Sequence, residues 1–269
     1  MRFSGLAVCV ATLLFALAAG EARAWGPVAQ EAVASKAIDA LPKGVKEFYK
    51  AHRLEMPTLA LEPTYPEETP DWRFAVDRLM PYPFLDLPHS EKGLKDKYGD
   101  AAAIGRLPWL LQESYARLVE AFKAKDKTRI LEESDLLAAL VAQIHNPLAL
   151  TDNADGQKSD QHGLYVRFTV KFPEAMASKL KVSPDAAIYL DDPKGYVFSM
   201  LNSSYVWVDN LLFLDELSKR GKGGYGEIYF EDLATRAADF LSRRLTLAAN
   251  DASSYWYTAW TDAQRPELK

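Results

Sequence analysis

Cysteine is nearly absent from this 269-residue sequence, and the single one, Cys9, falls within an N-terminal segment that we interpret as a signal peptide. In residues 1–24, Arg2 precedes an uncharged apolar stretch from Leu6 to Ala18, and Ala22-Arg23-Ala24 provides the small-x-small pattern of a cleavage site. Cleavage after Ala24 leaves a chain without cysteine. Internal disulfides are then excluded, and the apolar core alone must hold the fold.

Two alternatives concern this N-terminal segment. A retained membrane anchor is disfavoured because the apolar stretch is shorter than the roughly 18 residues that a spanning helix needs. Lipid attachment at Cys9 is disfavoured by the bulky Val8 and by the short stretch that precedes it. We therefore expect a bacterial protein that is periplasmic or secreted, with no transmembrane segment in its mature part.

The sequence also lacks an excess of positive charge and the common motifs of nucleophilic catalysis. Its 32 basic and 37 acidic residues give a net charge of −5, which does not favour bulk binding to nucleic acid. It has no Gly-x-Ser-x-Gly elbow, and the glycines of 221–224 lack the Ser or Thr that ends a phosphate-binding loop. We therefore assign no catalytic residue.

What the sequence does contain is helical periodicity, with no convincing strand alternation. This predicts a single all-α domain over residues 25–269. The proline-rich segment 57–88 carries aromatic residues and is interpreted as a loop packed on the body. An aromatic segment, 255–260, is expected to close the core after the last helix. The expected helices cover about 27–41, 44–52, 107–125, 126–148, 197–217 and 230–249. Asp126 is expected to cap the N-terminus of the helix over 126–148.

Two separated motifs resemble the zinc-dependent phospholipase C and single-strand-specific nuclease family. The first is Trp25-Gly26-Pro27-Val28-Ala29-Gln30, matching the family's Trp-Gly start. The second runs from Ala139 to Ala149 and matches a histidine-rich motif on a long helix. Shorter similar pieces are Phe48-Tyr49-Lys50, Pro108-Trp109, the 153–157 loop, Gln161-His162-Gly163 and residues 255–263. The resemblance implies a multi-helix domain of that architecture.

In that family, the α-amine and carbonyl of the first residue, here Trp25, join histidine and carboxylate side chains around zinc. The metal generates a hydroxide that attacks a phosphodiester. Here the matching ligand positions hold Gln30, Glu62, Pro83, Ala139, Gln143, Ala149, Tyr165 and Thr169. Only Glu62 keeps a metal-binding side chain, so Trp25 and Glu62 are the vestigial remainder of the family's metal ligands. His145 matches a framework histidine.

The resemblance therefore implies an exported pseudoenzyme without a cofactor. Its former active-site cleft, lined by Gln30, Phe84, Gln143, Tyr165 and Thr169, is expected to bind an uncharged ligand or a protein partner. The alternative is a zinc-dependent phosphodiesterase, acting as a phospholipase C or nuclease with a reduced or rebuilt metal site. A third hypothesis is a structural or assembly role.

The polar loop after the second motif is another candidate metal site. The loop from Thr151 to His162 contains Asp152, Asp155 and Asp160, but its first and last positions lack the acidic residues of a calcium loop. A solvated loop beside a packed His145 is the favoured interpretation.

Overall fold

A computed structural model describes residues 25–61 and 69–268. The described part of the chain contains helices and no strand, which confirms the all-α prediction. The signal-peptide prediction and Glu62 lie outside the described residues. The α-helices are α1 (Pro27–Ala40), α2 (Lys43–Ala51), α3 (Glu91–Tyr98), α4 (Leu107–Ala124), α5 (Lys127–Ile144), α6 (Leu164–Val166), α7 (Phe172–Ala175), α8 (Pro193–Tyr205), α9 (Val208–Lys219) and α10 (Glu227–Asp262).

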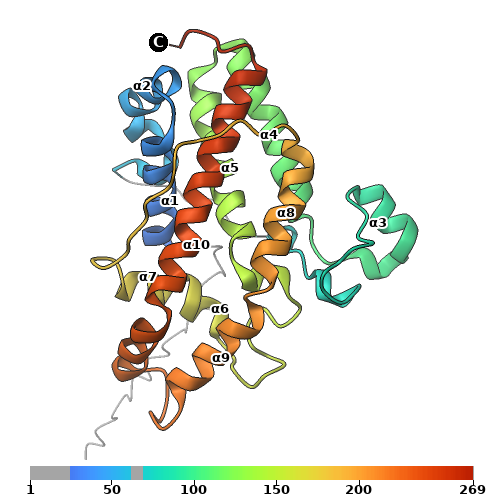
Figure 1. Ribbon diagram of the computed structural model, residues 1–269, viewed down its shortest axis with the longest axis vertical. Coiled ribbons are helices and arrows are strands. Elements are labelled where there is room, and N and C mark those ends of the chain that lie inside the picture. The colour runs from blue at the N-terminus through green and yellow to red at the C-terminus, as the bar shows by residue number, and fades with distance from the viewer. Residues whose placement is uncertain (1–24, 62–68, 269) are drawn as a thin grey trace, which may run out of the picture.

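The longest helix, α10, runs along the body of the molecule and organises the bundle (Figure 1). It packs against α1, α4, α5 and α9. Leu233, Ala237, Leu241, Leu245 and Ala249 recur at intervals of about one turn, and all are buried. Among the helices of the described chain, none is both long enough and apolar enough to cross a membrane.

The reversal between α4 and α5 follows from local sequence. Lys125 adopts a left-handed conformation that ends α4. Asp126 then caps α5, its Oδ1 accepting a hydrogen bond from the Arg129 backbone N–H at 3.1 Å. The predicted cap is therefore confirmed.

Two helix predictions need correction. The helix expected over 197–217 is interrupted at Val206 and Trp207, where the Trp207 ring packs 5.5 Å from that of Phe240 in α10. The last helix does not stop near residue 249 but continues through the aromatic segment to Asp262. In both cases, tertiary packing overrides local preference.

The aromatic segment packs inside the domain, as expected. Trp256 is fully buried, stacks on Tyr49 with ring centroids 4.8 Å apart, and donates its indole N–H to the Ser134 carbonyl at 3.0 Å. Such a ring removes a large apolar area from water while its polar atom remains bonded. It serves the core rather than a binding surface.

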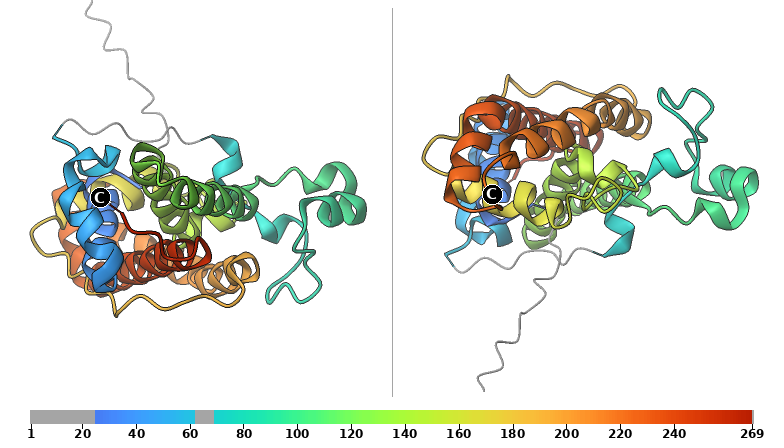
Figure 2. Two further views of the ribbon diagram at one scale, coloured as in Figure 1. Left: turned by 90° about the horizontal axis from the view of Figure 1, so that it is seen from above. Right: turned by 90° about the horizontal axis from the view of Figure 1, so that it is seen from below.

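The proline-rich segment is only partly packed on the body. Trp72 and Phe74 are buried, as expected, and Phe74 meets Trp109 of α4 edge-on at 5.4 Å. Farther along, a lobe containing α3 projects to one side of the bundle (Figure 2). Helix α3 was not predicted from the sequence; it begins where the Ser90 hydroxyl accepts a hydrogen bond from the Gly93 N–H.

Candidate functional site

The beginning of the described chain is fixed between three elements. The Trp25 indole N–H donates to the Ala142 carbonyl in α5 at 2.8 Å, and the Gly26 N–H donates to the Thr169 carbonyl at 2.9 Å. The Gln30 side-chain amide donates to the Trp25 carbonyl at 2.6 Å. The structure therefore brings Trp25 and Gln30 together, and the Trp25 carbonyl accepts a hydrogen bond from the Gln30 amide.

Three further predicted residues meet beside this anchor. The Gln143 amide donates to the Tyr165 hydroxyl at 2.7 Å and to the Trp72 carbonyl at 3.2 Å. Thr169 lies in a five-residue π-helix, η7 (Arg167–Lys171), and donates its hydroxyl to the Tyr165 carbonyl at 2.8 Å. We call Trp25, Gln30, Gln143, Tyr165 and Thr169 the neutral cluster.

Phe84 is placed differently from the other residues expected in the cleft. Its ring contacts the ring of Tyr205 in α8 at 4.8 Å and that of Tyr82 at 5.6 Å. Phe84 is 4% exposed, so it is a packing residue of the projecting segment. Its expected role in lining the former cleft is not supported by these contacts.

The neutral cluster fills space rather than lining an open cleft. Gln143 and Thr169 are fully buried and Tyr165 is 2% exposed. The cavity beside Gln30 has a volume of about 10 Å³ and is also bordered by Asp135 and Ala139. A space of this size holds about one water molecule. Within the described residues, Gln143, Tyr165 and Thr169 are joined by hydrogen bonds, and Gln30 Oε1 is buried without a hydrogen-bond partner. The small volume of the cavity corrects the expectation of a ligand-sized cleft at this place.

No metal centre is evident elsewhere in the described ranges, which contain no group of three or more His, Cys, Asp or Glu side chains suited to a metal ion. His145 is buried, and its Nε2 lies 2.7 Å from Asp251 Oδ2. In the polar loop, Asp155 accepts from the backbone N–H groups of Gly163 and Tyr165. These contacts fit a packed histidine and a loop shaped by its own hydrogen bonds.

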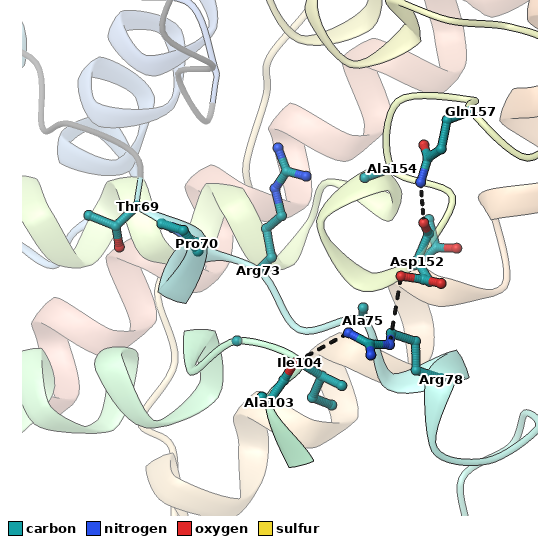
Figure 3. A pocket seen from close by; sticks show the side chains of 12 residues that line it. Thr69, Pro70, Arg73, Ala75, Arg78, Ala103, Ile104, Asp152, Ala154 and Gln157 are labelled. Atoms are coloured by element: carbon teal, nitrogen blue, oxygen red, sulfur yellow. Dashed lines mark hydrogen bonds and ion pairs between the residues drawn. The ribbon is translucent and has the colours of Figure 1, made fainter. Parts of the chain in front are cut away.

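A larger pocket, of about 600 Å³, lies next to the neutral cluster. Its walls come from the chain around 69–78, from 103–105 and from the 151–157 loop (Figure 3). Arg73 connects the two places, because it borders the pocket while its guanidinium lies over the Tyr165 ring, 4.7 Å from the centroid. No sequence motif marks this pocket, because only the fold brings its residues together.

Replacing Tyr165 by phenylalanine is expected to lower the free energy of unfolding by about 1–2 kcal/mol, because the buried Gln143 amide loses its hydroxyl acceptor. Urea unfolding of the purified variant measures the change. Tyr82→Phe is the control, since Tyr82 is 49% exposed and its change is expected to stay within about 0.5 kcal/mol. Equal effects of the two substitutions would show that the Gln143–Tyr165 hydrogen bond contributes little.

No protein-family model matches the chain, and no curated protein sequence matches it either.

Proposed function

We propose that this protein is an exported, non-catalytic relative of the zinc-dependent phospholipases C and single-strand-specific nucleases, and that it acts by binding. The hydrogen bond from Gln143 to Tyr165 carries the proposal. These residues occupy two positions where the resemblance implies an acidic ligand and a histidine. An amide and a phenol bonded to each other form a neutral core element, whereas zinc requires histidine, thiolate or carboxylate donors.

The surroundings support the same proposal. Ala139 borders the small cavity and has no lone pair to offer a metal. The Gln30 amide donates to the Trp25 carbonyl, the oxygen that would otherwise face a metal ion. A hydroxide-generating centre needs several donors around one open coordination position. The described side chains instead occupy that space.

Metal content together with phosphodiesterase activity tests the proposal. For protein that begins at Trp25 and is purified without chelators, we expect much less than one zinc per chain. We also expect no hydrolysis of a phosphodiester substrate, even with added zinc. The variant Gln30→His, Gln143→Asp, Tyr165→His, Thr169→Glu returns donors to the neutral cluster and is expected to gain zinc affinity. Stoichiometric zinc with metal-dependent turnover in the unaltered protein would instead establish the alternative, a phosphodiesterase with a rebuilt site.

A further inference from the structure

We infer that Arg244 binds a small carboxylate at the break between α8 and α9. The guanidinium of Arg244 is buried, and the donors on one of its edges have no hydrogen-bond partner in the described chain. The inference goes beyond the proposed function and does not depend on it, because it involves no residue of the neutral cluster.

Arg244 is a buried cation. It lies in α10 and is 3% exposed, although arginine is seldom fully buried unless it is paired. Among the described residues it forms no ion pair, and its hydrogen bonds run from Nη1 alone. Burial lowers the pKa of Arg244 to about 10, since removal from water disfavours the charged form. The side chain therefore remains charged at neutral pH without a paired carboxylate.

The hydrogen bonds of Arg244 fix its orientation and leave one edge free. Nη1 donates to the Ser203 carbonyl and to the Ser204 hydroxyl, each at 3.4 Å, near the end of α8. Nε is buried without a partner, and no hydrogen bond of the described chain involves Nη2. A buried N–H that bonds to nothing is costly. Nε and Nη2 together form an edge that can bind both oxygens of one carboxylate.

Three other arginines of this protein show what that edge does. Each donates from both Nε and Nη2 to one acidic side chain: Arg106 to Glu91, Arg167 to Asp215, and Arg236 to Asp232. Arg167 is buried like Arg244, and Asp215 fills its edge. Arg244 offers the same pair of donors, so a carboxylate is the group that they match best.

The nearest acidic group does not take this place. Asp251 lies about two turns farther along α10, and its Oδ2 is 2.7 Å from His145 Nε2. Its Oδ1 accepts from the Tyr196 hydroxyl at 2.9 Å. Both oxygens therefore have other partners. Asp251 lessens the positive potential at Arg244 from a distance, whereas the neighbouring Arg243 adds to it.

The surroundings of Arg244 favour a small ligand that enters at the α8–α9 break. Ser203 and Val206 are exposed there, so the guanidinium lies close beneath the surface. The Trp207 ring lies 5.9 Å from the guanidinium and packs on Phe240. Because these groups cover Arg244 almost completely, the ligand class is that of the smallest carboxylates, such as formate.

Urea unfolding at increasing concentrations of sodium formate tests the inference. A ligand that binds only the folded state raises the folding equilibrium constant in proportion to its concentration, once its dissociation constant is exceeded. In the unaltered protein we expect this constant to increase about tenfold for each tenfold rise in formate above that point. Arg244→Met is expected to lose the response, because methionine has no donors. An equal response in both proteins, or none in either, would overturn the inference.

Two further variants serve as controls. Arg243→Met removes the same charge from the adjacent, exposed position and should respond to formate like the unaltered protein, so general effects of salt cancel. Arg244→Lys keeps the charge but lacks the paired donors, and it should need about tenfold more formate for the same response. If circular dichroism shows that Arg244→Met is unfolded, Arg244→Lys decides. A response of Arg244→Lys equal to that of the unaltered protein would contradict the assignment.

The same series with sodium phosphate tests the class of ligand. A response to phosphate at lower concentrations than to formate, lost in Arg244→Met, would identify a phosphate site and overturn the carboxylate assignment. A response to formate at the lower concentrations would support it. All solutions contain EDTA, so the outcome does not depend on the metal content that tests the proposed function.

Discussion

Replacement of Asp215 by alanine is expected to lower the free energy of unfolding by about 3–5 kcal/mol, among the largest effects in the molecule. Asp215 and Arg167 form an ion pair at 3.2 Å, with side chains 1% and 6% exposed. Asp215 also accepts from the Tyr229 hydroxyl at 2.5 Å and from the Gln161 amide at 2.8 Å. Removing the carboxylate leaves a buried guanidinium without its counter-charge.

This network joins segments that are far apart in the sequence. Arg167 begins the π-helix η7, Asp215 lies in α9 and Tyr229 in the first turn of α10, while Gln161 belongs to the polar loop. The Arg167 guanidinium also lies over the Tyr225 ring at 3.5 Å. Loss of Asp215 is therefore expected to weaken the packing of α9 and the first turn of α10 against η7. The same π-helix carries Thr169 of the neutral cluster.

Urea unfolding followed by circular dichroism measures the effect. Glu216→Ala is a closely matched control, because the adjacent Glu216 forms an exposed ion pair with Arg220, and such pairs contribute about 0–1 kcal/mol. The double variant Arg167→Met, Asp215→Leu is expected to be more stable than Asp215→Ala, since no charge remains buried. A loss below about 1 kcal/mol for Asp215→Ala would contradict the role of this ion pair.

Replacement of Asp135 by asparagine is expected to stabilise the protein at pH 7 and to remove much of the pH dependence of its stability. Asp135 is 2% exposed in α5 and borders the small cavity beside Gln30. Burial raises the pKa of Asp135 from 3.8 to about 6, although hydrogen bonds from the Thr58 hydroxyl and N–H partly oppose the shift. Ionisation of this side chain therefore opposes folding.

The direction in which stability changes with pH follows from proton binding to Asp135. Between about pH 4 and pH 6, the unfolded chain releases the Asp135 proton while the folded chain retains it, so stability falls as the pH rises through this window. One pKa unit corresponds to about 1.4 kcal/mol, so the raised pKa costs the folded state about 3 kcal/mol at pH 7. Asparagine carries no charge, and its amide can donate to the Thr58 hydroxyl while its oxygen accepts from the Thr58 N–H.

Urea titrations from pH 4 to pH 8 measure this difference. The unaltered protein should lose stability relative to Asp135→Asn as the pH increases, with the gap reaching its full size above about pH 7. Glu132→Gln is the control on the same helix, since Glu132 is exposed. A constant difference between Asp135→Asn and the unaltered protein at every pH would show that Asp135 does not titrate between its two states as described.

Several features of the fold could be predicted from local sequence. Pro27 begins α1, and Asp126 caps α5, because both depend on backbone groups of the nearest turn. The α3 helix was missed, since its eight residues lie between prolines and have only Leu94 buried. The break between α8 and α9 and the full length of α10 depend on packing between distant rings, which hydrophobic periodicity does not report.

The candidate site, like the fold, could be predicted from the sequence only in part. Hydrogen bonds bring Trp25, Gln30, Gln143, Tyr165 and Thr169 together, whereas Phe84 packs against Tyr205. The motif order implied that Gln30, Phe84, Gln143, Tyr165 and Thr169 line one cleft. It did not predict that they are buried and leave a cavity of about 10 Å³. Side-chain packing sets that volume, because neutral groups can bond to one another where charged ligands would require a metal.

The sequence by itself determined that this protein is helical and that alanine, proline and amide side chains stand at most positions where the resemblance implies zinc ligands. These are properties of individual residues and of their neighbours along the chain. Only the tertiary structure decided that the neutral cluster is buried and that Arg73 and Arg78 line a separate pocket formed with the 151–157 loop. A cavity depends on how distant segments pack, and that information is not contained in any one of them.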